Sequence, residues 1–128
     1  MIANIARYHK GSLPKDRHPS YAALSPADRA TVARLAGILR VADAMDRRHD
    51  NRVQDLLCKR TRHVFHVQAT SAIECENELS EAGRRLKLFE RAFQCKLKLT
   101  WERAAGEIKR DVMSSQQADR AHAKAQER

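Results

Sequence analysis

Residues 52–69 have the sequence RVQDLLCKRTRHVFHVQA, which distinguishes a mixed α+β fold from an all-helical one. Two short runs rich in Val, Leu and Phe, at 52–59 and 62–69, flank the polar sequence Lys59–Arg62. Runs of strand length on either side of a polar turn predict a β-hairpin. The chain therefore combines a sheet with its helices.

The residues after this hairpin predict one helix and a third strand. Glu74, Glu76 and Glu78 favour a helix start, because carboxylates are stabilised at the positive end of the helix dipole. The apolar residues expected on the buried face of this helix are Leu79, Ala82, Leu86, Phe89 and Phe93. Residues 95–101 then alternate apolar with polar side chains, which is typical of a half-buried strand. The predicted order over 51–101 is β-β-α-β.

Towards the N-terminus, Ser25-Pro26-Ala27-Asp28 predicts the start of a long helix over 26–47. Ser25 is a capping residue, Pro26 suits the first turn, and Asp28 favours the positive end of the dipole. The apolar face expected of this helix comprises Val32, Leu35, Ala36, Leu39, Ala42 and Met45, broadened by Ile38 and Val41. Such a face is wider than one neighbouring element requires.

A shorter helix is predicted over 2–9, with Ile2, Ile5, Ala6 and His9 at helical spacing. Gly11 and Pro14 end it, and the segment 10–21 is predicted to be a polar loop with His18-Pro19 extended.

The whole pattern predicts an α+β fold in three parts. These are a helical segment over 1–50, the β-β-α-β unit over 51–101, and a charged tail over 102–128 that is expected to be largely flexible. The last fifteen residues contain no apolar residue larger than Ala. Ile108, Val112 and Met113 are compatible with one further short helix.

Composition narrows the class of protein. The chain has 128 residues, of which 42% are hydrophobic and 32% charged, a globular balance with room for one domain or two small units. No window approaches the roughly 18 uncharged apolar residues of a membrane span, and the first residues do not form a secretory signal. Three cysteines, an odd number, predict a reducing compartment. We therefore expect a cytoplasmic protein.

The net charge of +9 favours polyanionic partners. The basic residues fall into three sets along the chain: Arg7, Lys10, Lys15 and Arg17; Arg40, Arg47 and Arg48; Arg84, Arg85, Lys87 and Arg91. Arg40 and Arg47 are two helical turns apart, so a row of guanidinium groups is expected to bridge phosphate oxygens. Aromatic residues are only 5% of the chain, which disfavours single-stranded nucleic acid.

Three stretches resemble one known family. IANIARYHK at 2–10, followed by Leu13-Pro14, and LRVADAMDR at 39–47 resemble motifs of the exopolyphosphatase and guanosine pentaphosphate phosphohydrolase family. They lie there in a helical domain of the C-terminal half, which is similar to HD phosphohydrolases. Glu78, LKLFE at 86–90 and Phe93 resemble the helix of the small β-containing unit that ends those proteins. The resemblance covers roughly residues 2–101.

The resemblance implies an accessory domain without the catalytic phosphate-binding domain, which forms the N-terminal half of that family. The four glycines are isolated from one another in the sequence, so this chain cannot form a Gly-rich phosphate cradle. No catalytic residue is therefore assigned. Arg7, Lys10, Arg40, Arg47 and Arg48 are the predicted contacts to polyphosphate or guanosine pentaphosphate.

The expected protein partner is a second copy of the chain or a catalytic domain. If the helices that cover residues 2–9 and 32–45 in the family are missing, the apolar surface there is expected to mediate self-association. No membrane contact is expected.

Two alternatives remain open. His9, Asp43 and Asp46 could ligate a divalent metal in an HD-type phosphohydrolase, because Asp43 resembles the last carboxylate ligand of such sites. The upstream His and His-Asp pair have no counterpart, and His49-Asp50 follows Asp43 instead of preceding it. The other alternative is a basic nucleic-acid-binding module.

The cysteines suggest zinc only weakly. Cys58, Cys75 and Cys95 lie in the same part of the sequence as two histidines, but no Cys-x-x-Cys pair is present. Buried structural thiols are the favoured interpretation, and the acidic residues after Cys75 make it a poor nucleophile. No cofactor is expected apart from the divalent metal of the HD-type alternative.

Overall fold

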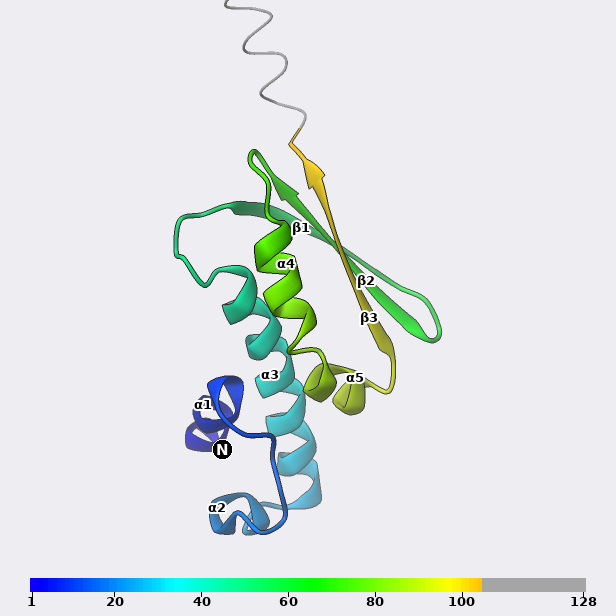
Figure 1. Cartoon of the computed structure of the whole chain (residues 1–128). Helices are drawn as coiled ribbons and strands as arrows, with labels where there is room; N and C mark the ends of the chain where they lie inside the picture. The colour runs from blue at the N-terminus through cyan, green and yellow to red at the C-terminus, as the bar shows by residue number, and fades with distance from the viewer. Residues whose placement is uncertain (105–128) are drawn as a thin grey trace, which may run out of the picture.

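The computed structural model describes residues 1–104 and has an α+β architecture (Figure 1), as predicted. Its helices are α1 (Ile2–Lys10), α2 (Pro19–Ala22), α3 (Pro26–Met45), α4 (Glu76–Gly83) and α5 (Lys87–Phe93). Its strands are β1 (Val53–Arg60), β2 (Val64–Ser71) and β3 (Lys96–Arg103). No helix within residues 1–104 is long and apolar enough to cross a membrane.

The strands form a mixed sheet in the order β1-β2-β3. β1 and β2 are antiparallel and form the predicted hairpin, in which the Thr61 N–H donates to the Val64 carbonyl at 2.9 Å. β3 lies parallel to β2, because α4 and α5 carry the chain back across the sheet between these strands. The helices α3, α4 and α5 lie on one side of the sheet (Figure 1).

Two predicted boundaries were wrong. The single helix expected after the hairpin is broken at residues 84–86 into α4 and α5, where the Arg85 N–H donates to the Ala82 carbonyl in a tighter turn. The break lets Leu88 and Phe89 enter different clusters of the core.

The tail was predicted to begin at residue 102, but strand structure extends beyond that point. β3 continues to Arg103, and the Ala104 N–H donates to the Ser71 carbonyl. Residues 105–128, with the possible helix around Ile108, lie outside the described part.

The core has two clusters that meet at α5. The cluster under the sheet contains Val41, Ala44, Met45, Val67, Ala69, Ala82, Phe89, Cys95 and Leu97. The second cluster, between α1, α3 and α5, contains Tyr8, Val32, Ala36 and Leu88. Phe93, as predicted, and Trp101 both pack against the first cluster. The C-terminal half of α3 thus shares its core with the sheet.

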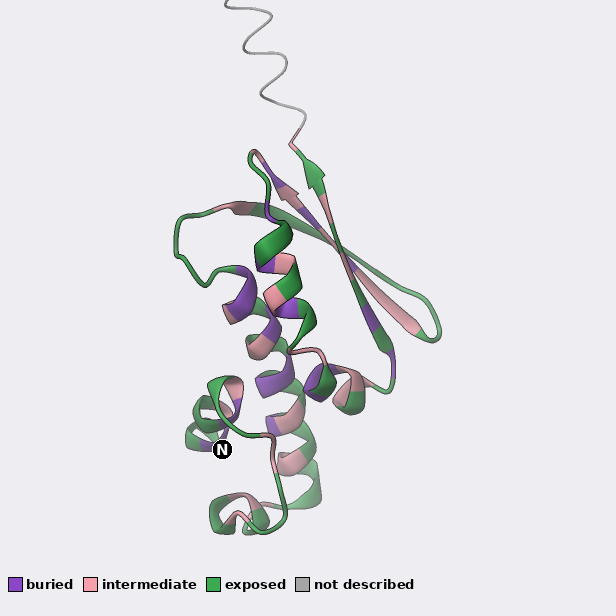
Figure 2. Cartoon of the chain, viewed as in Figure 1, coloured by how far each residue is buried: buried purple, intermediate pink, exposed green. Residues whose placement is uncertain are grey.

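The helix α3 starts as predicted and buries part of the predicted face, namely Val32, Ala36, Val41 and Met45, whereas Ala42 is exposed. The Ser25 hydroxyl accepts the Asp28 N–H at 3.1 Å and donates to the Asp28 carboxylate at 2.8 Å. Leu35, Ile38 and Leu39 are 43–44% exposed, contrary to prediction, because α5 and α4 pack on the neighbouring side of the helix (Figure 2).

The helix α1 also buries an unexpected face. Tyr8 and Asn4 are buried, whereas Ile2 is 83% exposed. Tyr8 stacks on His18, its Oη lying 2.8 Å from His18 Nδ1, and Asn4 hydrogen-bonds Ser20. Polar partners in the 10–21 segment therefore decide how α1 is oriented, and apolar periodicity does not detect them.

We predict that stability falls as the pH drops below about 6.5. Burial lowers the pKa of His18 below its ordinary 6.5, and the positive charges of Arg7, Arg17 and Lys15 lower it further. The unfolded chain then takes up this proton at a higher pH than the folded chain does. The stabilisation is therefore complete above 6.5 and is lost as the pH falls towards the folded pKa.

Thermal melts between pH 7.5 and 5.5 test this prediction. The melting temperature of the wild type should fall more steeply than that of His18→Gln, which cannot titrate. Parallel curves for the two proteins would show that His18 does not contribute.

Candidate anion-binding site

A cavity of about 200 Å³ lies where the ends of α1 and α3 meet the turn between α4 and α5. It is lined by Lys10, Asp43, Arg47, His49 and Arg85. One cation thus comes from each of the three basic sets of the sequence. Lys10 and Arg47 are predicted anion contacts, so the fold brings two of the five predicted residues to one cavity.

The cations of this cavity outnumber its single carboxylate. Lys10 Nζ lies 3.5 Å from Asp43 Oδ1, and Arg47 Nη1 lies 3.2 Å from Glu81 Oε2. Within residues 1–104, Arg85 has no carboxylate within ion-pair distance. An anion in the cavity would therefore meet at least one cation that has no competing partner among the described residues.

Arg40 lies beside the cavity and is occupied with the backbone. Its Nη1 donates to the carbonyl oxygens of Tyr8 at 2.7 Å and Gly11 at 2.8 Å, so it satisfies the C-terminal end of α1. Burial lowers the pKa of Arg40, and the positive charge of Arg85 lowers it further. The predicted row of Arg40 and Arg47 is absent, because α3 ends at Met45 and the two side chains reach different helices.

We expect Arg40→Ala to destabilise the protein by about 2–3 kcal/mol, since two charge-assisted hydrogen bonds are lost and two carbonyls lose their donor. Urea denaturation measures the change. Arg40→Lys is the matched control: it keeps the charge and should recover part of the loss. An Arg40→Ala protein as stable as the wild type would contradict the role of Arg40 at the end of α1.

The other predicted anion contacts, Arg7 and Arg48, do not line the cavity. The Arg7 guanidinium lies over the Tyr8 ring at 5.7 Å. Arg48 Nε is 3.7 Å from the Glu78 carboxylate, which is 5% exposed and is also approached by Arg52. Arg48 is thus engaged with the buried Glu78 carboxylate. Arg85, which was not predicted as an anion contact, lines the cavity instead.

The residues of the metal hypothesis have other partners in the fold. His9 Nδ1 lies 2.7 Å from the Ala6 carbonyl, Asp43 pairs with Lys10, and Asp46 Oδ2 lies 3.3 Å from His49 Nδ1. In the part of the chain that the structure describes, no three His, Cys, Asp or Glu side chains are grouped so that they could hold a metal ion. The described geometry therefore adds no support for an HD-type metal centre.

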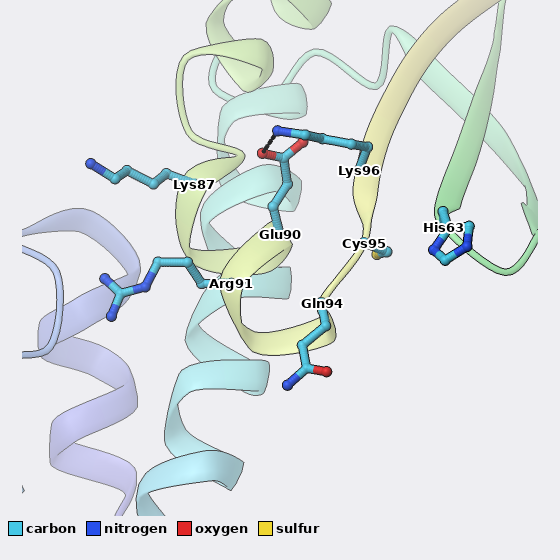
Figure 3. A pocket seen from close by; sticks show the side chains of 7 residues that line it. All are labelled: His63, Lys87, Glu90, Arg91, Gln94, Cys95 and Lys96. Carbon is cyan, nitrogen blue, oxygen red and sulfur yellow. Dashed lines mark hydrogen bonds and ion pairs between the residues drawn. The ribbon is translucent and has the colours of Figure 1, made fainter.

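A second basic hollow, of about 410 Å³, lies beside α5 (Figure 3). Lys87 and Arg91 extend to the same side of this helix, one turn apart. Glu90 accepts hydrogen bonds from Lys96 Nζ at 3.4 Å and from the Leu97 N–H at 3.1 Å, so its charge is directed towards β3. Two members of the third basic set, Lys87 and Arg91, therefore lie on one face of α5.

The cysteines differ in their environments. Cys75 and Cys95 are buried, as predicted, whereas Cys58 on β1 is exposed, contrary to prediction, because none of the helices within residues 1–104 covers this edge of the sheet. Burial raises the pKa of Cys75, and the Glu78 carboxylate raises it further, which agrees with its prediction as a poor nucleophile.

Comparison with known proteins assigns no family. No protein-family model matches the chain, and no curated protein matches it significantly.

Proposed function

We propose that this chain is the C-terminal accessory domain of an exopolyphosphatase-like phosphohydrolase, which binds polyphosphate or guanosine pentaphosphate and contributes to dimerisation. The observation that carries the proposal is the basic cavity of Lys10, Arg47 and Arg85 at the junction of α1, α3 and the α4–α5 turn. These residues come from the stretches 2–10 and 39–47, which resemble the family, and from the turn just before LKLFE.

A chain of phosphates fits this surface better than a single anion does. The cavity of about 200 Å³ has room for one phosphate group beside its cations. Lys87 and Arg91 place two further cations on α5, the helix that follows Arg85. Guanidinium and ammonium groups spaced along one surface bind successive phosphates, whereas an isolated phosphate uses only one subsite. The supporting features are the succession of cations and the unpaired state of Arg85 among the described residues.

Hydrolysis is not assigned to these residues. In the proposed assembly, the terminal phosphoanhydride is cleaved in a separate catalytic domain, and this chain holds the remainder of the substrate. The exposed apolar side chains of β1 support the association part of the proposal, since Leu56 is 47% exposed and Leu57 is 52% exposed.

A fluorescence titration with labelled long-chain polyphosphate at near-physiological salt tests the binding part. Competition with duplex DNA of matched charge is the control. Micromolar binding that DNA does not displace supports the proposal. Equal displacement by DNA reduces the site to general electrostatic attraction, as a nucleic-acid-binding module would show, and absence of binding refutes the anion site.

A further inference from the structure

The strand β1 is an exposed edge of the sheet. It pairs with β2 alone among the described strands, and all of its residues after Val53 are exposed (Figure 2). Leu56 is 47% exposed and Leu57 is 52% exposed, next to the exposed Cys58. An edge strand with an apolar centre presents free backbone groups to another strand.

The hydrogen bonds of the hairpin show which backbone groups face this edge. The Thr61 N–H donates to Val64, so residues 59, 57 and 55 also direct their N–H and C=O groups towards β2. Residues 56, 58 and 60 therefore direct theirs away from it. In agreement, the Leu56 N–H donates to the carboxylate of its neighbour Asp55 at 2.8 Å instead of to β2.

We propose that two copies of this chain associate through β1, antiparallel about a two-fold axis at Leu57, to form one continuous six-stranded sheet. Leu57 then lies opposite Leu57 of the second copy, and Leu56 lies opposite Cys58 of that copy. Asp55 and Lys59 lie on the face of the strand opposite to that of Leu56. Asp55 of each copy lies opposite Lys59 of the other copy. Like cross-strand pairs within one sheet, these pairs stabilise the contact.

The charges select this register over its neighbours. Because residues 56, 58 and 60 must supply the hydrogen bonds, the nearest alternatives place the two-fold axis at Leu56 or at Cys58. With the axis at Leu56, Asp55 of one copy faces Leu57 of the other. With the axis at Cys58, Asp55 of one copy faces Thr61 of the other. The axis at Leu57 places Asp55 of each copy opposite Lys59 of the other, while Arg60 faces the neutral Gln54. The bulge between Val53 and Asp55 limits the regular ladder at its end.

The exposed stripe of α3 is a poorer surface for a second copy. If Leu35, Ile38 and Leu39 packed on themselves in an antiparallel pair of helices, Asp28 would lie close to Asp46 of the other copy. A parallel pair would bring each of these carboxylates close to its own equivalent. Like charges at both ends oppose self-association there, whereas β1 pairs opposite charges.

Disulfide trapping of the full chain tests the register. In a Cys58→Ser background, Leu57→Cys should form a disulfide-linked dimer readily, since directly opposite residues of a non-hydrogen-bonded pair approach within disulfide range. Leu56→Cys in the same background is the matched control, equally exposed but diagonal to its equivalent. We expect the control and native Cys58 to cross-link about fivefold less. Equal cross-linking at all three positions, or preferential cross-linking at Leu56→Cys or at Cys58, would overturn the register.

Sedimentation velocity of charge variants tests the contact without cysteine chemistry. Asp55→Lys and Lys59→Asp should each weaken the dimer about tenfold, because each places like charges opposite each other. The double variant should restore the dimer, which a folding defect would not do. Failure of restoration, or a monomeric wild type at about 100 μM, overturns the proposal.

This inference rests on the dimerisation part of the proposed function and is independent of the anion site. A monomer that still binds polyphosphate refutes the β1 contact and leaves the binding proposal in place. A β1-linked dimer that binds no polyphosphate supports the contact and refutes the binding proposal.

Discussion

Gly37→Val should lower the free energy of unfolding by about 3 kcal/mol, the largest stability effect that we expect from one substitution. A Cβ at Gly37 would lie 3.0 Å from the Cα and N atoms of Phe89 and 3.3 Å from the Leu88 carbonyl carbon. These are backbone atoms, so no side-chain rotation relieves the clash. The helices α3 and α5 must separate, and both clusters of the core meet at this contact.

Gly83→Ala is the matched control for this prediction. A Cβ at Gly83 meets no atom within 4 Å, so the substitution should leave the packing intact. It should stabilise the chain by roughly 0.5–1 kcal/mol, because alanine loses less backbone entropy than glycine in a helix. Urea denaturation of both variants measures the difference. A Gly37→Val protein with wild-type stability would mean that α3 and α5 do not approach as closely as described.

Lys10→Ala/Arg85→Ala should weaken polyphosphate binding about 10- to 30-fold, the largest functional effect expected, since two charge-assisted contacts are lost. The loss of Lys10 also frees the Asp43 carboxylate, which then repels the anion in the same cavity. Neither side chain belongs to the two core clusters, so the fold should survive. The fluorescence titration measures the affinity, and a thermal melt verifies the fold.

Arg62→Ala/Lys98→Ala removes the same net charge at a distance from the cavity and serves as the control. Arg62 lies in the turn between β1 and β2, and Lys98 is exposed on β3. Screened charges remote from the ligand contribute little, so we expect less than about a threefold loss. Equal losses for the two double variants would show that net charge, and not the cavity, determines affinity.

Individual basic residues could be found from the sequence, but their roles could not. Lys10 and Arg47 were predicted from charge and from the resemblance, and both line the cavity. Arg40 was predicted with them, yet its guanidinium holds the end of α1, which is 32 residues away in the sequence at Tyr8. A hydrogen bond between such distant positions depends on how α1 packs on α3. No local pattern contains that information.

The missed residue, Arg85, illustrates the same limit. The sequence placed it in a basic set on one long helix, where it would have followed Arg84 around the helix. The turn at 84–86 ends α4 and directs Arg85 to the cavity, whereas Arg84 pairs with Glu81 at 3.0 Å. The break has a tertiary cause, because Leu88 and Phe89 fill different clusters and Gly37 admits the backbone of α5.

Elements that depend on neighbouring residues could be predicted without the structure. The Ser25 cap, the hairpin between residues 53 and 71, and the alternation of Leu97, Leu99 and Trp101 are all local patterns, and the structure confirms them. Three features required the folded chain: the buried faces of the helices, the parallel direction of β3 and β2, and the cavity shared by cations from three segments. Those features arise from packing between distant segments, whose free energy is not encoded in any single stretch of the chain.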